Sequence, residues 1–175
     1  KKLYFRFSFE RDTGTGNPGI LKDEQRCIKI LKECFCIMEE ALLKGNRDEE
    51  KTEKEMVKAF RKYGKSYPDA GYGLRFGEWI ASSDPKPYNS FGNGSAMRVS
   101  PVAWYFYSLE KVEKFAEISA KVTHDHEEGI KGAKATAAAI FLARNGRTKD
   151  YIKRYIELKY RYDFSKSLDE IRPDY

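Results

Sequence analysis

Helical periodicity dominates this chain and leaves little of it for a sheet. Apolar residues recur every three or four positions in successive segments, the spacing that places them along one face of a helix. These segments span residues 23–44, 48–63, 96–107, 109–122, 127–144 and 148–162. Only Leu3, Phe5, Phe7 and Phe9 alternate with the period of a strand. The pattern predicts an all-α protein, a helical bundle of four to six helices with one short strand at its N-terminus.

A turn-rich stretch divides the chain near its start. Residues 13–19 carry three glycines, a proline and an asparagine, a composition typical of a flexible turn or linker. We therefore expect residues 1–20 to form an N-terminal strand and linker, and residues 21–175 to form the helical domain. The 175 residues match the length of one compact domain, and a hydrophobic content of 41% is enough for a packed core.

Composition and charge restrict location and partners. No run of about eighteen uncharged apolar residues is present, and the N-terminus lacks the apolar region of a signal peptide, so we expect no membrane association and a cytoplasmic location. The three cysteines fall within residues 27–36, and their odd number favours reduced thiols that pack in a helix. The net charge of +6 permits a phosphate-bearing partner.

Residues 147–162 combine basic side chains with tyrosines. Proteins that bind single-stranded nucleic acid use the same combination of residues. The pattern also fits a solvated helix whose tyrosines pack inward, and we favour this interpretation over nucleic-acid binding.

The most unusual passage is the glycine-rich loop within residues 81–95, which is too long for a simple connection. Two glycines flank Asn93 and allow the backbone to approach a ligand closely. Because a predicted helix follows, the loop amides could face a phosphate or a sugar. The alternative is a connector that ends in a capping serine. Arg98 follows the loop, where it would pair with a phosphate or with a surface acid.

Both histidines, His124 and His126, precede the helix predicted at 127–144. Side chains two positions apart diverge on a helix and there is no third histidine, so a metal site would need carboxylates from elsewhere. Three alternatives stay open: metal binding, ligand contact or helix capping, and an exposed polar turn. No Ser-His-Asp or Cys-His arrangement follows from the spacing, which leaves the catalytic residues unknown.

Two motifs, in this order, resemble those of the ADP-ribosylglycohydrolase family. They are Ser90-Phe91-Gly92-Asn93-Gly94-Ser95-Ala96-Met97-Arg98-Val99, and Thr123-His124 followed by Gly129-Ile130-Lys131-Gly132-Ala133. The resemblance extends from about residue 37 to residue 175, and residues 39–45 are similar to the first core helix of the family. Residues 1–26 do not resemble the family.

The resemblance implies an all-α bundle that binds ADP-ribose. In active members it also implies cleavage of ADP-ribose from a protein side chain or a related acceptor, with two magnesium ions. The implied substrate-binding residues are Ser90, Phe91, Gly92, Asn93, Gly94, Ser95 and His124. In that arrangement the loop holds the diphosphate and the ribose, and His124 lies beside the ligand. The expected partner is ADP-ribose or an ADP-ribosylated substrate.

The acidic motifs with which the family binds magnesium are not recognisable in this sequence. On the alignment of the first core helix, residues 29–32 stand at the first motif and read Lys, Ile, Leu, Lys. A lysine cannot replace a carboxylate ligand of Mg²⁺. The second motif would follow Ile171 and is not found either. We therefore expect no metal ligands in this chain, although active family members use Mg²⁺, and we expect a truncated bundle.

One main hypothesis and two alternatives follow. The main one is an ADP-ribosylglycohydrolase-like protein that hydrolyses or binds ADP-ribose attached to an acceptor, with weak or no activity as an isolated chain. The first alternative is a non-catalytic protein that sequesters or senses ADP-ribose or a similar nucleotide, and the second is an interaction or nucleic-acid module. Because a truncated bundle would expose residues 133–143, we also expect self-association or a partner chain that completes the bundle.

Overall fold

The structure is a computed structural model that describes residues 37–68, 70–167 and 170. Within these residues the regular elements are all helices, so the prediction of an all-α protein is confirmed. The predicted N-terminal strand, the boundary near residue 20 and the three cysteines lie outside the described residues.

The helices follow one another along the chain with short connections, except before α4. Residues 37–45 are helical, and they are followed by α2 (Glu49–Ser66), α3 (Leu74–Ala81), α4 (Gly94–Arg98), α5 (Ser100–Tyr105), α6 (Leu109–Lys121), α7 (Glu127–Arg144) and α8 (Lys149–Tyr160). The periodicity predicted α2, α6, α7 and α8 to within a few residues. It missed α3, because Gly73 and Gly77 interrupt the apolar pattern there.

The helix expected at 96–107 is instead two short helices. α4 ends at Arg98, and α5 begins at Ser100 with Pro101 in its first turn. Proline has no amide hydrogen with which to continue the hydrogen bonds of a preceding helix, so the chain changes direction here. α4 packs mainly against α7, while α5 packs against both α6 and α7.

Polar side chains cap the starts of several helices, as expected from sequence for α6. The side chains of Asp48, Ser108 and Thr148 accept hydrogen bonds from amides in the first turns of α2, α6 and α8. At the end of the helix at 37–45, Asn46 has a φ of 51°, a left-handed conformation that glycine and asparagine tolerate at helix ends. These caps explain why the helix ends are readable from sequence.

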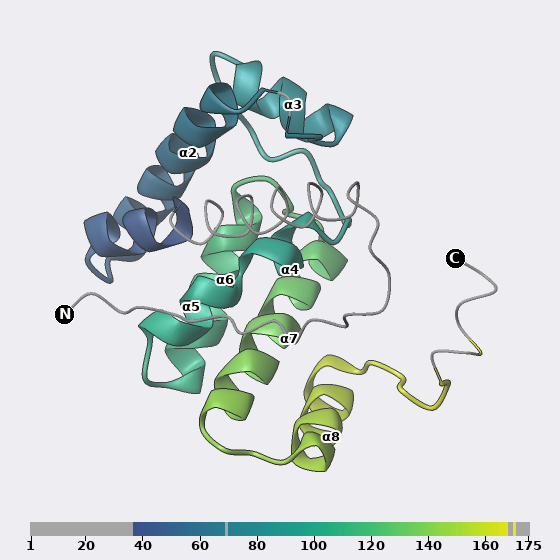
Figure 1. Ribbon diagram of the computed structural model, residues 1–175. Coiled ribbons are helices and arrows are strands. Elements are labelled where there is room, and N and C mark those ends of the chain that lie inside the picture. Colours follow the sequence, from purple (N-terminus) through teal and green to yellow (C-terminus); the bar gives the residue numbers. More distant parts are fainter. Residues whose placement is uncertain (1–36, 69, 168–169, 171–175) are drawn as a thin grey trace, which may run out of the picture.

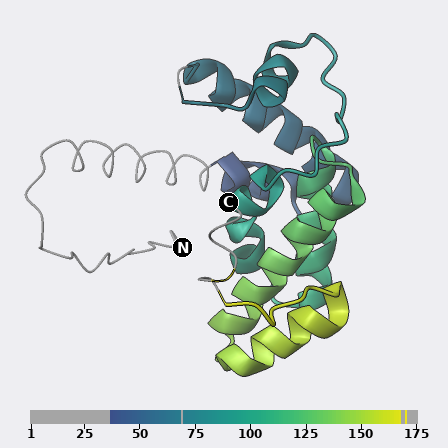
Figure 2. The same ribbon diagram turned by 90° about the vertical axis from the view of Figure 1, so that its right-hand side faces the viewer.

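The central helix of the bundle is α7, which packs against α4, α5, α6 and α8 (Figure 1). α2 packs against α3 and α6, and both views place α2 and α3 at the opposite end of the molecule from α8 (Figures 1 and 2). Small buried residues let α7 accept so many close neighbours: Gly129, Ala133, Ala135, Ala137 and Ala138.

The apolar interior has two parts. The main core includes Met38, Met56, Val102 and Phe106, and all four side chains are buried. A smaller cluster joins Ala135 and Ala138 of α7 to Ile156 and Tyr160 of α8. α8 is therefore attached to the bundle through an apolar cluster of its own.

The alanines of α7 bear on the expected self-association. Ala133, Ala135, Ala137 and Ala138 are buried by neighbouring helices of the same chain, so at these positions the expected exposure is not seen. Self-association stays a prediction.

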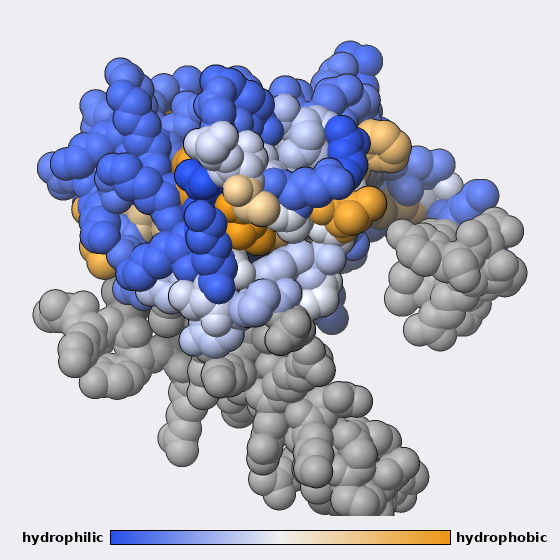
Figure 3. Space-filling view, turned by 90° about the horizontal axis from the view of Figure 1, so that it is seen from above, coloured by the Kyte–Doolittle hydropathy of each residue, from blue (hydrophilic) through white to orange (hydrophobic). Residues whose placement is uncertain are grey.

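The end of the molecule formed by α2 and α3 is largely hydrophilic when seen from above, with a few hydrophobic residues between polar ones (Figure 3). Among the described residues, no helix combines the length and the apolar character needed to cross a membrane.

Candidate functional site

A groove of about 660 Å³ lies between the glycine-rich loop, α7 and α8. The loop and the start of α4 form one side with Phe91, Gly92, Asn93 and Ser95. Small side chains of α7 form the floor, and α8 forms the other side. We call the loop side the loop wall and the α8 side the helix wall.

The floor of the groove depends on glycine at the start of α7. A Cβ atom on Gly129 would lie 2.6 Å from the carbonyl oxygen of Ser90 and 3.1 Å from the Cβ atom of His124. The first distance is too short for any side chain and the second is a tight contact, so glycine lets the loop approach α7 this closely. Gly132, one turn later, has more space, because the nearest atom to its added Cβ would be the Tyr162 hydroxyl at 3.7 Å.

Three hydrogen bonds hold the loop in place, and each has a backbone group as one of its partners. The buried Ser95 hydroxyl donates to the carbonyl oxygen of Gly129 at 2.8 Å. The amide of Asn89, a residue with a left-handed φ of 52°, donates to Asp125 Oδ1 at 2.6 Å. Inside the loop, the Gly92 amide donates to Ser90 Oγ at 3.2 Å. Both ends of the loop are thus bonded to residues at or just before the start of α7.

A polar network lies beneath the loop. Arg98 Nη2 donates to the carbonyl oxygen of Ser119 and to Thr123 Oγ1, each at 2.7 Å. Thr123 Oγ1 also lies 2.7 Å from His124 Nδ1. Because a guanidinium can only donate, Thr123 Oγ1 accepts the hydrogen bond from Arg98, and the same hydroxyl connects Arg98 to the ring of His124.

His124 is a neutral, buried side chain. It is 5% exposed, and burial together with the nearby positive charge of Arg98 lowers the pKa of His124 to about 4. Its Nε2 atom lies against the loop, since a Cβ atom on Gly94 would be 3.1 Å away. His124 therefore supports the loop from below in its uncharged form.

The predicted site residues fall into two groups. Phe91, Gly92, Asn93 and Ser95 line the groove. The other three, which are Ser90, Gly94 and His124, lie behind these residues and contact the start of α7 or one another. Contact between His124 and a ligand stays a prediction.

His126 and Arg98 have roles that the sequence left open. His126 Nδ1 accepts the amide of Glu128 at 3.1 Å and caps α7, and its ring lies 5.3 Å from that of Phe91. Helix capping is thus confirmed for His126. The sequence predicts a phosphate or a surface acid as the partner of Arg98. In the structure Arg98 instead donates to Ser119 and Thr123 in the network beneath the loop.

The helix wall was not predicted from the sequence. Lys149, Ile152, Lys153 and Ile156 line the groove from α8, and their spacing places them on one face of that helix. The spacing of these residues is evident in the sequence, but the sequence does not indicate that this face of α8 lies across a groove from the glycine-rich loop. Two tyrosines on α8, Tyr155 and Tyr160, turn inward, as the solvated-helix interpretation of residues 147–162 requires.

The described residues do not fit a magnesium site. Within residues 37–68, 70–167 and 170, no three His, Cys, Asp or Glu side chains gather closely enough to hold a metal ion. The carboxylate that lines the groove, Glu128, pairs with Lys131 at 2.5 Å. Mg²⁺ requires several oxygen ligands in octahedral geometry, and this part of the chain does not supply them.

Comparison with known proteins gives consistent relatives. ADP-ribosylhydrolase ARH3 of Bos taurus is 30% identical over 147 residues, which are 76% of this chain and 40% of the relative. ADP-ribosylhydrolase ARH3 of Gallus gallus is 30% identical over 125 residues, or 63% of this chain and 33% of the relative. An uncharacterized protein of Archaeoglobus fulgidus is 54% identical over 48 residues, or 27% of this chain and 16% of the relative. The match thus spans well under half the length of each relative.

The family model for ADP-ribosylglycohydrolase matches residues 28–173. This range contains the glycine-rich loop, the network beneath it and both walls of the groove. The helical fold, the loop and the extent of the match agree, and the chain belongs to the ADP-ribosylglycohydrolase family.

Proposed function

We propose that the groove binds the ADP-ribose unit of free ADP-ribose or of an ADP-ribosylated substrate. One observation carries the proposal: residues of the family loop line a groove of about 660 Å³. Sites for small molecules and cofactors commonly have volumes of several hundred Å³ and a few well-placed polar groups. A nucleotide sugar of the size of ADP-ribose matches this range.

The chemistry of both walls suits such a ligand. On the loop wall, Gly92 bears no side chain, so a diphosphate can approach the backbone closely. Lys149 and Lys153 on the helix wall bring positive charge to the same groove. The ring of Phe91 is 72% exposed at the edge of the groove, where an adenine base can stack on it.

We also propose that hydrolysis by this chain alone is weak or absent. The name of the relatives, ADP-ribosylhydrolase, describes cleavage of bonds to ADP-ribose. Without metal ligands among its described residues, this part of the chain has no visible group to activate water or to stabilise developing charge. Binding is then the function that the described groove supports best.

Calorimetric titration with ADP-ribose, with and without Mg²⁺, tests both parts of the proposal. We expect binding in both conditions and intact ADP-ribose in the mass spectrum of the recovered ligand. Rapid release of ADP-ribose from an ADP-ribosylated protein would contradict the second part. An ADP-ribosylated protein that keeps its modification after long incubation would favour the non-catalytic alternative, in which the protein sequesters or senses ADP-ribose.

Two variants of equal exposure localise the binding. Phe91 and Met97 are both 72% exposed, but only Phe91 is among the residues that line the groove. Loss of base stacking in Phe91→Ala should weaken binding about tenfold, while Met97→Ala should bind like the unaltered protein. Equal affinities of the two variants would place the ligand elsewhere.

A further inference from the structure

α8 forms a wall of the groove, yet it has few attachments to the bundle. Among the helices of the described residues, it packs closely only against α7. Its buried residues, Ile156 and Tyr160, belong to the small apolar cluster and not to the main core. The position of the helix wall therefore depends on a limited set of contacts.

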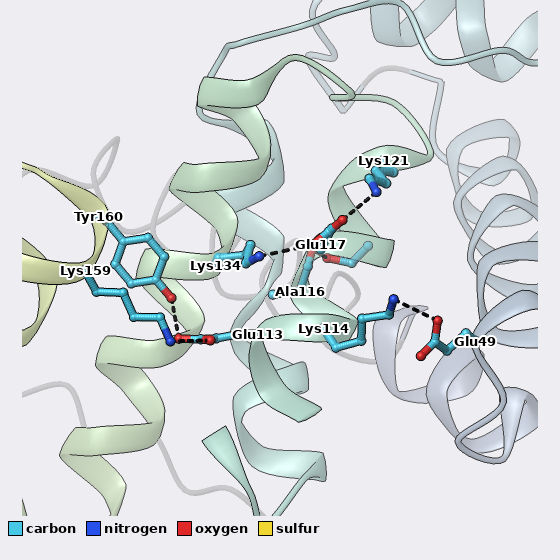
Figure 4. Close-up of polar contacts among 10 residues, drawn as sticks. Glu49, Glu113, Lys114, Ala116, Glu117, Lys121, Lys134, Lys159 and Tyr160 are labelled. Carbon is cyan, nitrogen blue, oxygen red and sulfur yellow. Dashed lines mark hydrogen bonds and ion pairs between the residues drawn. The ribbon is translucent and has the colours of Figure 1, made fainter. Parts of the chain in front are cut away.

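The carboxylate of Glu113 on α6 accepts hydrogen bonds from several side chains of α8 (Figure 4). Glu113 Oε1 accepts hydrogen bonds from the hydroxyls of Tyr155 at 2.9 Å and Tyr160 at 2.6 Å. Lys159 Nζ donates to Glu113 Oε2 at 2.6 Å. We call these four residues the α8 anchor. They connect α8 to α6, a helix against which its backbone does not pack closely.

The carboxylate at the centre of the α8 anchor is largely shielded from solvent, while Lys159 reaches it from the surface. The side chain of Glu113 is 13% exposed. Burial alone would raise the pKa of Glu113, but the hydrogen bonds from Lys159, Tyr160 and Tyr155 outweigh burial and keep its pKa below the ordinary value. Glu113 is thus ionised at neutral pH, and hydrogen bonds to an ionised, partly buried acceptor are stronger than neutral ones.

The α8 anchor and the groove are linked through the body of α8. Ile156 lines the groove, and it also packs in the same apolar cluster as Tyr160, one turn later. A shift of α8 away from α7 would move Lys149 and Lys153 away from the loop wall. The contacts of Glu113 with the last turn of α8 therefore help to fix the positions of the α8 residues that line the groove.

We propose that Glu113 is a positioning residue of the groove: by holding Tyr155, Lys159 and Tyr160, it fixes α8 against α7 and sets the affinity for ADP-ribose. Glu113 does not line the groove and has no contact with the ligand in this scheme. The inference rests on the proposed function, since it concerns affinity for ADP-ribose in the same groove.

Glu117 provides a matched control for Glu113. It lies one turn further along α6 and is 24% exposed, and it pairs with Lys121 and with Lys134 of α7 (Figure 4). Both glutamates thus join α6 to another helix, but the partners of Glu117 are not on α8. Substitution of either residue removes one negative charge and its ion pairs.

The experiment compares Glu113→Gln with Glu117→Gln in the full chain by calorimetric titration with ADP-ribose and by hydrogen exchange. In Glu113→Gln we expect affinity to fall about five- to tenfold, the size of the net contribution of one ordinary hydrogen bond, and the amides of α8 to exchange faster. In Glu117→Gln we expect unchanged affinity and unchanged exchange in α8. Thermal unfolding of both variants shows that they are folded.

A double-mutant cycle separates positioning from general stability. If Glu113 acts through the α8 anchor, Tyr160→Phe should weaken binding in the unaltered protein and have little further effect in the Glu113→Gln background. Unaltered affinity in Glu113→Gln, or an equal loss in Glu117→Gln, would overturn this inference alone. Absence of binding by the unaltered protein would instead overturn the proposed function, and this inference with it.

Discussion

The two walls of the groove are held by different kinds of contact. The loop wall is held mainly through backbone groups: Ser95 donates to the Gly129 carbonyl, and Arg98 donates to the Ser119 carbonyl. The helix wall is held by long side chains that meet at Glu113. The first arrangement needs close approach of the backbone, and the second needs flexible side chains of the right length.

This difference predicts how each wall responds to mutation. A Cβ atom added to Gly129 would meet a backbone carbonyl at 2.6 Å, and a backbone group cannot rotate away as a side chain can. One methyl group therefore displaces the loop. At the helix wall, each substitution of a side chain on α8 removes only one of the hydrogen bonds to Glu113. We therefore expect abrupt failure at the loop wall and graded effects at the helix wall.

The largest effect is expected for Gly129→Ala. The new methyl group meets the Ser90 carbonyl, so we expect a stability loss of about 2–3 kcal/mol and no measurable ADP-ribose binding, checked by thermal unfolding and calorimetry. Gly132→Ala is the control, because its Cβ would make only ordinary contacts. Alanine is a better helix former than glycine, so this control should gain about 0.5–1 kcal/mol in stability. Equal unfolding temperatures of the two variants would refute the close approach.

Arg98→Met should have the next largest effect. It leaves the Ser119 carbonyl and the Thr123 hydroxyl without this donor, at a cost of about 2 kcal/mol in the free energy of unfolding. Because the positive charge of Arg98 contributes to the low pKa of His124, that pKa should rise in the variant. NMR titration of the His124 ring measures this rise, and an unchanged pKa would mean that Arg98 does not act on His124.

Acid should weaken the loop wall through His124. The pKa of His124 is about 4 in the folded protein, below the ordinary value of 6.5 that we expect in the unfolded chain, so between these values the unfolded chain binds more protons. Stability should therefore fall steadily as the pH drops from about 6.5 to about 4. Unfolding midpoints across this range test the slope. His124→Gln should flatten it, whereas His126→Gln, which leaves His124 in place, should not.

The smallest effect is expected for Tyr160→Phe at the helix wall. The variant keeps the ring in the apolar cluster and removes the hydroxyl that donates to Glu113, which should cost about 1 kcal/mol. Tyr151→Phe is the control, since Tyr151 is 48% exposed and lies outside the α8 anchor. Chemical denaturation compares the two. A loss above that of Arg98→Met would reverse the ranking of the two walls.

Local signals in the sequence account for much of the fold and for the loop wall. Ser108 caps α6 as predicted, and the glycine-rich loop lines a groove at the start of α7. Both features depend on residues close together in sequence, or on glycine positions that only a close approach explains. The resemblance to the family predicts that the same loop binds the ligand.

The helix wall and α3 were not predictable, because they depend on tertiary contacts. Glu113 and Tyr160 are 47 positions apart, and nothing local to either residue says that they meet. α3 follows Gly73 and contains Gly77, a poor helix former, so we attribute its stability chiefly to contacts with α2. The break at Pro101 was visible in the sequence, but the rest of the pattern favoured a continuous helix.

The short connection between α6 and α7 has a further consequence, for the order in which the protein folds. α6 and α7 are adjacent in sequence and pack closely, and residues 122–126 join them. Contacts between neighbours in sequence cost little chain entropy to close, so this helical hairpin is the natural place for folding to begin. Thr123 and His124 lie in that connection, so we expect these two supports of the loop to be in position before the loop itself docks.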